Sequence, residues 1–261
     1  MREFLGIGGY VRTPEGAYSW QHLTFVFVLM GLMVFLAVFF GLRNRNRDEI
    51  IKNRVIIAAA ILIDAIEIFK LIVICTRGQG IVELRTNLPL FLCSIQLIAL
   101  PLAAFTKGRI KEASLDFVFI FGILSGMMGI IGAAQNFNAY PVLSLDNMAS
   151  GLTHSISGFA SIYIGVSGSA SMKKKNIPFT YGILILFVVL AFIANTLLDY
   201  NYMFLVRPDG TPYQIFYNMV GGSSVLYPMI VVAVFLIYIA VFYLVYGLIK
   251  GRKEKRSKRS N

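Results

Sequence analysis

Cys93, Ser94 and Gln96 place a thiol, a hydroxyl and a carboxamide within four residues of an otherwise apolar stretch that runs from Leu88 to Pro101. Polar groups inside a membrane are costly to leave unpaired, so they usually face a protein interior and often serve function. A membrane cysteine is either a small apolar residue that fills space or a reactive group. We take Cys93 as the candidate nucleophile.

His154 is the second candidate, and it lies in a run of small and polar residues from Gly151 to Gly158. A thiol and an imidazole together support nucleophilic catalysis, in which the thiolate attacks an acyl carbonyl and a thioester divides the reaction into two steps. Burial in an apolar layer disfavours the thiolate, so a base or a cation must lie near it. His154 and Lys70 are the side chains that can provide this help.

The composition indicates the elements that must position these groups. The 261 residues are 57% hydrophobic and 14% charged, with a mean hydropathy of +0.72. Apolar runs of about 20 residues recur along the chain, which is the length that spans a bilayer as a helix. The sequence therefore predicts an all-α, polytopic membrane protein.

Seven stretches have this length and character. We predict spans near residues 20–42, 55–75, 88–105, 113–135, 147–170, 178–200 and 225–249. They form one bundle over residues 20–249, between an N-terminal segment, 1–19, and a basic tail, 250–261. Residues 1–19 lack the basic start, apolar core and cleavage site of a removable signal peptide.

Four clusters of Lys and Arg give the orientation. The net charge is +11, and the cations gather in the segments 43–54, 107–111, 173–175 and 250–259, all on one side of the seven predicted spans. Cations mark the cytoplasmic side, so we expect the N-terminus outside and the C-terminus inside a cell membrane. The same pattern indicates that the basic residues contact anionic lipid headgroups, and it argues against a nucleic-acid partner.

This topology brings four polar residues to one depth. Cys93 and His154 follow the outer ends of their spans by five and seven residues, and Lys70 and Glu67 precede the outer end of theirs by five and eight. At about 1.5 Å per residue, all four lie roughly 8–12 Å below the outer boundary.

Gln96 is close by in sequence, and Asp199 and Asn201 sit just above the layer. The sequence predicts a polar pocket here, with Gln96, Glu67, Lys70, Asp199 and Asn201 as supporting or substrate-binding residues.

The charged residues of the second span leave two interpretations open. Asp64, Glu67 and Lys70 have helical spacing, so opposite charges can pair within the helix. They form either a self-neutralising pair or the polar wall of a substrate cavity, and in the second case a transporter or solute-binding protein is the alternative to an enzyme. The two cysteines, Cys75 and Cys93, have no metal-ligand spacing, and we expect neither a metal nor a cofactor.

Three segments carry a family resemblance: Leu88 to Cys93, the run around His154, and Asp199 to Leu205 with Pro208 beyond it. Over most of its length, from about Trp20 to Ile249, the chain resembles the YwaF-like family of bacterial integral membrane proteins. The animal relatives of that family are the transmembrane protein 164 group, acyltransferases that act on ether phospholipids.

The resemblance implies an acyl-accepting cysteine at Cys93, a histidine partner at His154 and membrane phospholipids as partners. One departure concerns Phe91, which stands where bacterial relatives often have a histidine two residues before the cysteine. Either His154 serves alone as the base, or this member lacks the activity. The function predicted from the sequence is a lipid acyltransferase or acyl hydrolase.

Overall fold

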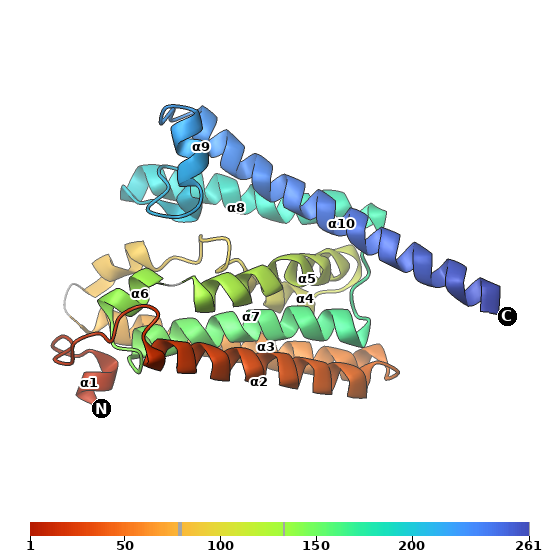
Figure 1. Cartoon of the computed structure of the whole chain (residues 1–261), viewed down its shortest axis with the longest axis horizontal. Coiled ribbons are helices and arrows are strands. Elements are labelled where there is room, and N and C mark those ends of the chain that lie inside the picture. The colour runs from red at the N-terminus through yellow and green to blue at the C-terminus, as the bar shows by residue number, and fades with distance from the viewer. Residues whose placement is uncertain (78–79, 133, 261) are drawn as a thin grey trace. The chain divides into compact units, whose positions relative to one another are not determined.

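The structure is a computed structural model that describes residues 1–77, 80–132 and 134–260. Every regular element in this part of the chain is helical, as Figure 1 shows. The chain divides into two compact units, residues 1–170 and residues 171–261, which are called unit 1 and unit 2 below.

Two long helices of unit 1 begin with a serine cap. The Ser19 side chain accepts a hydrogen bond from the backbone N–H of His22 (3.3 Å), and Ser144 accepts one from Asn147 (3.2 Å). Such caps satisfy N–H groups that have no partner within the helix. The elements of unit 1 are α1 (Arg2–Leu5), α2 (Trp20–Asn44), α3 (Glu49–Cys75), η1 (Gly80–Thr86), α4 (Gln96–Phe105), α5 (Gly108–Ile131), α6 (Ala134–Ala139) and α7 (Leu145–Ser167).

Helix α7 is the centre of unit 1, because it packs against α5, α2 and α3. Small residues permit this close packing. A Cβ atom on Gly126 of α5 would lie 2.9 Å from the Cα of Gly158 on α7, and one on Gly122 would lie 2.5 Å from the carbonyl oxygen of Ser157. The backbones of α5 and α7 are therefore in near contact at these two glycines.

The predicted third span is wrong at its start. Helix α4 begins at Gln96 and not at Leu88, and it has 10 residues. Pro89 has no N–H and disfavours a helical conformation at the residue before it. The chain then forms turns, in which Ser94 donates to the carbonyl of Phe91 (2.9 Å) and Gln96 to that of Cys93 (3.3 Å). Cys93 therefore lies on a turn that precedes a short helix.

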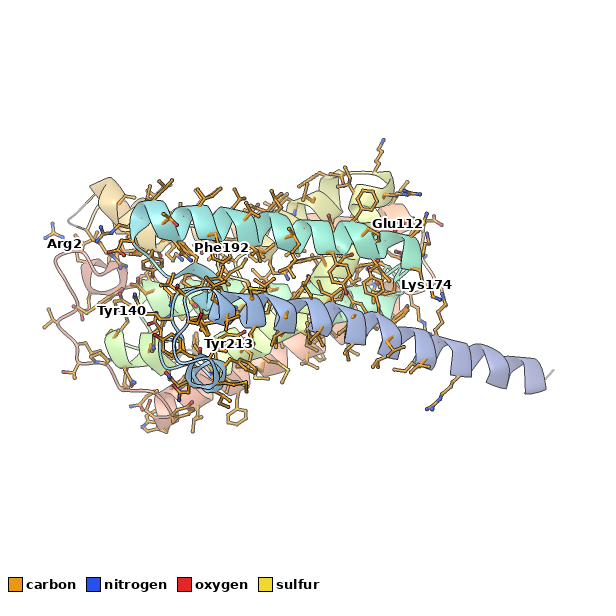
Figure 2. The ribbon with its side chains drawn as sticks, turned by 90° about the horizontal axis from the view of Figure 1, so that it is seen from above. Arg2, Glu112, Tyr140, Lys174, Phe192 and Tyr213 are labelled. Atoms are coloured by element: carbon orange, nitrogen blue, oxygen red, sulfur yellow. The ribbon has the colours of Figure 1, made fainter. Side chains whose placement is uncertain are left out.

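Unit 2 contains η2 (Lys174–Asn176), α8 (Ile177–Leu198), η3 (Tyr202–Phe204), α9 (Gln214–Met219) and α10 (Leu226–Ser260). Helices α8 and α10 are joined by polar contacts, since the hydroxyls of Thr180 and Tyr243 lie 3.0 Å apart. Tyr213, which precedes α9, packs edge-on against Phe235 of α10, with 6.1 Å between ring centroids. Figure 2 shows Tyr213 beside these helices and Phe192 on α8, a phenylalanine that is 41% exposed.

Four helical stretches of the described chain are long and apolar enough to cross a membrane: Trp20–Asn44, Gly108–Ala139, Lys174–Leu198 and Leu226–Arg252. Helices α3 and α7 are also long, with 27 and 23 residues, but they carry charged or small polar residues. The structure thus supports an all-helical membrane protein with several apolar helices.

Candidate active site

A cavity of about 210 Å³ lies within unit 1. Its walls come from α3, from the turn before α4 and the first residues of α4, from α6 and from α7. Glu67, Lys70, Cys93 and His154, which the sequence places at one depth, all line it. The complete lining is Ile63, Glu67, Lys70, Phe91, Cys93, Ser94, Leu97, Asn136, Ser150, Thr153, His154 and Ser157.

Cys93 reaches the cavity from irregular backbone. Its thiol is free and partly buried. Within a bilayer, non-helical backbone is tolerated only where it is buried in protein or lines a cavity, because each unpaired polar group is otherwise costly. The turn at residues 91–95 meets this condition, since Phe91, Cys93 and Ser94 all border the cavity. The irregular backbone before α4 thus brings Cys93 to the cavity.

His154 projects from α7 and is held from α5. The hydroxyl of Ser125 lies 3.1 Å from the Nδ1 atom of His154. A Cβ atom on Gly129 of α5 would overlap the His154 ring, so glycine is needed there to admit the imidazole. The contact with Ser125 therefore engages Nδ1, one of the two ring nitrogens.

The thiol and the imidazole are not bonded to each other. Among the described residues no hydrogen bond joins Cys93 to His154, although both line the same cavity. A catalytic base needs to reach its proton directly or through one water, and such contacts are often long before substrate binds. Cys93 and His154 thus line one cavity, which has space for a reacting group.

The charges of α3 pair as their spacing predicts. The Lys70 Nζ atom lies 2.6 Å from Glu67 Oε1, and these side chains are 15% and 14% exposed. Both also line the cavity, so the pair is self-neutralising and a polar wall at the same time. Asp64, one turn earlier, is only partly buried and is not among the residues that line the cavity.

Comparison with known proteins places the chain in a family. A model of the TMEM164 family matches residues 17–258. The chain belongs to the TMEM164 family. The match confirms the relationship to the transmembrane protein 164 group, and the bacterial YwaF-like grouping stays an expectation. No curated protein and no solved structure gives a significant match.

Gln96 of this TMEM164 family member lies in the chain between Ser94 and Leu97, which both line the cavity. It is fully buried, and within the described chain neither atom of its carboxamide has a hydrogen-bonding partner. Leaving such a group unpaired costs about 1–3 kcal/mol. Gln96 does not line the cavity, and its supporting role stays a prediction.

Asp199 and Asn201 belong to unit 2. Asp199 ends α8 in a left-handed conformation (φ 49°) and is exposed. Asn201 organises its own loop: its amide donates to the carbonyl of Arg207 (2.7 Å) and to Asp209 (2.8 Å), and its oxygen accepts from the backbone of Val206 (2.9 Å). The structure thus gives Asn201 a local role in the loop, and the supporting role of both residues in catalysis stays a prediction.

Sequence reasoning missed Ser125, which contacts His154, and did not single out several polar residues of α6 and α7 that line the cavity. Ser125 lies three residues after Gly122 and four before Gly129, so it shares a helix face with them. That spacing is a signal that a hydroxyl sits where α5 meets α7. The lining residues that were not singled out are Asn136, Ser150, Thr153 and Ser157.

Proposed function

We propose that this protein is a membrane-embedded acyltransferase or acyl hydrolase that acts on lipid acyl chains through a Cys93 thioester, with His154 as the base. The observation that carries the proposal is the single cavity that Cys93 and His154 line from separate elements. Membership of the TMEM164 family agrees with it. Membrane phospholipids are the proposed substrates.

The proposed reaction has two steps. In the first, His154 takes the thiol proton, the Cys93 sulfur attacks the carbonyl carbon of an acyl ester, and the C–O bond breaks while His154 returns the proton to the leaving oxygen. In the second, His154 takes a proton from an acceptor hydroxyl or from water, that oxygen attacks the thioester, and the thiol leaves with its proton restored. The acceptor decides between transfer and hydrolysis.

Lys70 supports this chemistry by its charge. A cation near a buried thiol favours the thiolate, and Lys70 borders the same cavity. Its ion pair with Glu67 reduces that effect until a substrate anion competes for the ammonium group. Lys70 is therefore a proposed substrate-binding residue, and Glu67 is the group that positions it.

The proposed topology has seven crossings of the cell membrane, with the N-terminus outside and the C-terminus inside. Helices α3 and α7, of 27 and 23 residues, are long enough, because 23 residues extend about 35 Å against a hydrocarbon layer of about 30 Å. Helix α4 extends only about 15 Å, so the third crossing combines it with the irregular segment that carries Cys93.

The proposal is tested by acylation of the purified protein in detergent. A p-nitrophenyl ester of a long-chain fatty acid serves as acyl donor, and intact mass spectrometry detects the adduct. Cys93→Ser should abolish a thioester adduct that hydroxylamine removes. Cys75→Ser is the matched control, since Cys75 is the other free and partly buried thiol, and it should keep the adduct. An undiminished thioester in Cys93→Ser would rule out the proposed mechanism.

The transport alternative predicts a different result. If the Glu67 and Lys70 pair lines a permeation path, Glu67→Lys should alter uptake of a solute into vesicles that contain the protein and leave acylation of Cys93 unchanged. If Cys93 is the nucleophile, the same change places a second cation in the cavity wall and alters the acylation rate. The two measurements on one variant separate the two functions.

A further inference from the structure

We propose that Ser125 is a positioning residue that holds His154 in the tautomer with its proton on Nδ1, so that Nε2 is the base in the cavity. This inference rests on the proposed function, in which His154 removes the Cys93 proton. It begins from one contact, the 3.1 Å between Ser125 Oγ and His154 Nδ1, which links α5 to α7.

A neutral imidazole carries one proton, and the partner of one ring nitrogen decides which nitrogen holds it. A base at Nε2 needs a free electron pair there, and this requires that Nδ1–H donates to the Ser125 oxygen. The Ser125 hydroxyl can accept this bond, because its oxygen carries two lone pairs and its own O–H can rotate away from the ring. Ser125 can also accept from Nδ1–H after Nε2 is protonated, so the contact persists through both states of the base.

Packing on both sides holds the two residues in register. Ser125 is 5% exposed. One turn along α5, Gly129 gives the His154 ring its space, and the neighbouring residue Gly126 lies against Gly158 of α7. Rotation of α5 relative to α7 would force backbone atoms into each other. The Ser125 hydroxyl therefore meets Nδ1 at a fixed place on the helix pair.

The second histidine of the chain provides an internal reference. The sequence contains two histidines, His22 and His154. At His22 the backbone N–H of Tyr18 donates to Nδ1 (2.8 Å), so Nδ1 is an acceptor and the proton of the neutral ring must be on Nε2. The proposal therefore predicts opposite tautomers for the two rings in one protein.

The first test is nitrogen NMR of the whole protein labelled with ¹⁵N-histidine, at a pH where both rings are neutral, with a His22→Gln sample for assignment. The expected spectrum has a protonated Nδ1 for His154 and a protonated Nε2 for His22. A protonated Nε2 on His154 would overturn the proposal, even if Cys93 is acylated normally. This measurement needs no change at Ser125.

The second test compares three variants in the acylation assay across pH. Ser125→Ala should lower the acylation rate on the order of tenfold and shift its pH profile, which is less than the 10²–10⁴-fold that a general base contributes. Ser125→Thr keeps the hydroxyl and should restore most of the rate. Ser114→Ala is the matched control, because Ser114 is a buried serine of the same helix whose hydroxyl has no partner among the described residues.

An unchanged rate and pH profile in Ser125→Ala, or equal losses in Ser125→Ala and Ser114→Ala, would contradict the positioning role. These outcomes differ from failure of the proposed function, which appears as retention of the thioester in Cys93→Ser. Circular dichroism at 222 nm checks that each variant keeps its helices.

Discussion

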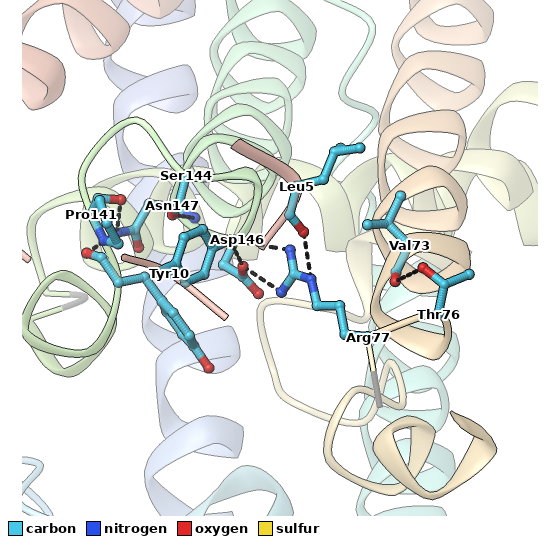
Figure 3. A network of polar contacts seen from close by, with 10 residues as sticks. Leu5, Tyr10, Val73, Thr76, Arg77, Pro141, Ser144, Asp146 and Asn147 are labelled. Carbon is cyan, nitrogen blue, oxygen red and sulfur yellow. Dashed lines mark hydrogen bonds and ion pairs between the residues drawn. The ribbon is translucent and has the colours of Figure 1, made fainter. Parts of the chain in front are cut away.

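Two polar clusters of unit 1 differ in whether their side chains form hydrogen bonds with one another. Just beyond α3, Arg77 donates to the carbonyl of Leu5 (2.6 Å), to Asp146 (2.7 Å) and to the hydroxyl of Tyr10 (3.1 Å), and Tyr10 in turn donates to Asp146 (Figure 3). These side chains satisfy one another. In the cavity, the thiol of Cys93 and the ring of His154 instead border a volume of about 210 Å³ and are not bonded to each other.

The difference separates a structural role from a functional one. The Arg77 cluster joins the N-terminal segment, the end of α3 and the start of α7, and a fully satisfied polar network of this kind makes a structure rigid. Leu5 also packs on the buried cluster of Val73, Leu145 and Ala149. Under the proposed function, the cavity instead keeps the Cys93 thiol and the His154 ring for a substrate. Changes in the cavity should therefore reduce activity, and changes in the Arg77 cluster should reduce stability.

The largest expected effect comes from Gly129→Ala. The new Cβ atom would occupy the space of the His154 ring, so the ring must move away from its contact with Ser125. A displacement of about 1 Å of a catalytic group can cost about 10²-fold in rate. The acylation assay should show a loss of that order.

Gly31→Ala is the matched control, since no other atom lies within 4 Å of a Cβ atom at Gly31 of α2. It should leave the acylation rate unchanged. If Gly129→Ala acylates as fast as the wild type, the role given to the His154 ring is wrong.

The positions of most helices could be predicted from the sequence. An apolar run of about 20 residues between polar loops has few alternatives to a helix, and the predicted start at Trp20 is the observed start of α2. The segment from Leu88 to Ile95 is equally apolar, but its backbone forms turns. Composition does not distinguish a buried turn from a buried helix, and the cavity beside Cys93 depends on how α3 and α7 pack around it.

The sequence predicted which residues share a pocket, but not how the helices around it pack. Lys70, Cys93 and His154 were predicted to share a pocket, and all three line the cavity. The depth counted for Cys93 assumed a helix from Leu88, and the backbone there forms turns instead. Contacts between helices depend on the central place of α7, which no residue count reveals. Ser125 was missed for this reason, and because a serine within a helix usually bonds to its own backbone.

A smaller effect, on stability, is expected for Arg77→Ala. The change leaves the Leu5 carbonyl and Asp146 without their cationic donor, and the Arg77 and Asp146 side chains are only 15% and 13% exposed. Loss of these charge-assisted bonds should lower the free energy of unfolding by about 2–3 kcal/mol. Thermal unfolding followed by circular dichroism measures it, and acylation of Cys93 should persist at temperatures below the transition.

The control is Arg207→Ala, which removes an ion pair with Asp209 whose side chains are 57% and 36% exposed. Exposed pairs contribute about 0–1 kcal/mol, so this variant should unfold close to the wild type. Equal destabilisation by the two arginine variants would contradict the structural role of the Arg77 cluster.

The smallest effect concerns pH and Tyr10. Burial, the hydrogen bond to Asp146 and the negative charge of Asp146 raise the pKa of Tyr10 from 10.0 to about 12. The folded state thus holds the phenol proton more tightly than the unfolded state does, so this stabilisation is complete below about pH 10 and is lost as the pH rises to about 12. Because Tyr10 is partly exposed, solvent screening reduces its contribution to about 1 kcal/mol.

Tyr10→Phe removes the titrating proton and keeps the ring, so the difference in unfolding free energy between wild type and variant should shrink between pH 10 and pH 12. Other tyrosines and lysines also titrate in this range, but they are common to both proteins and cancel in the difference. Chemical unfolding in detergent at several pH values measures the two curves. Parallel curves would show that the Tyr10 hydroxyl does not belong to the stabilising network, and would weaken the contrast between this cluster and the cavity.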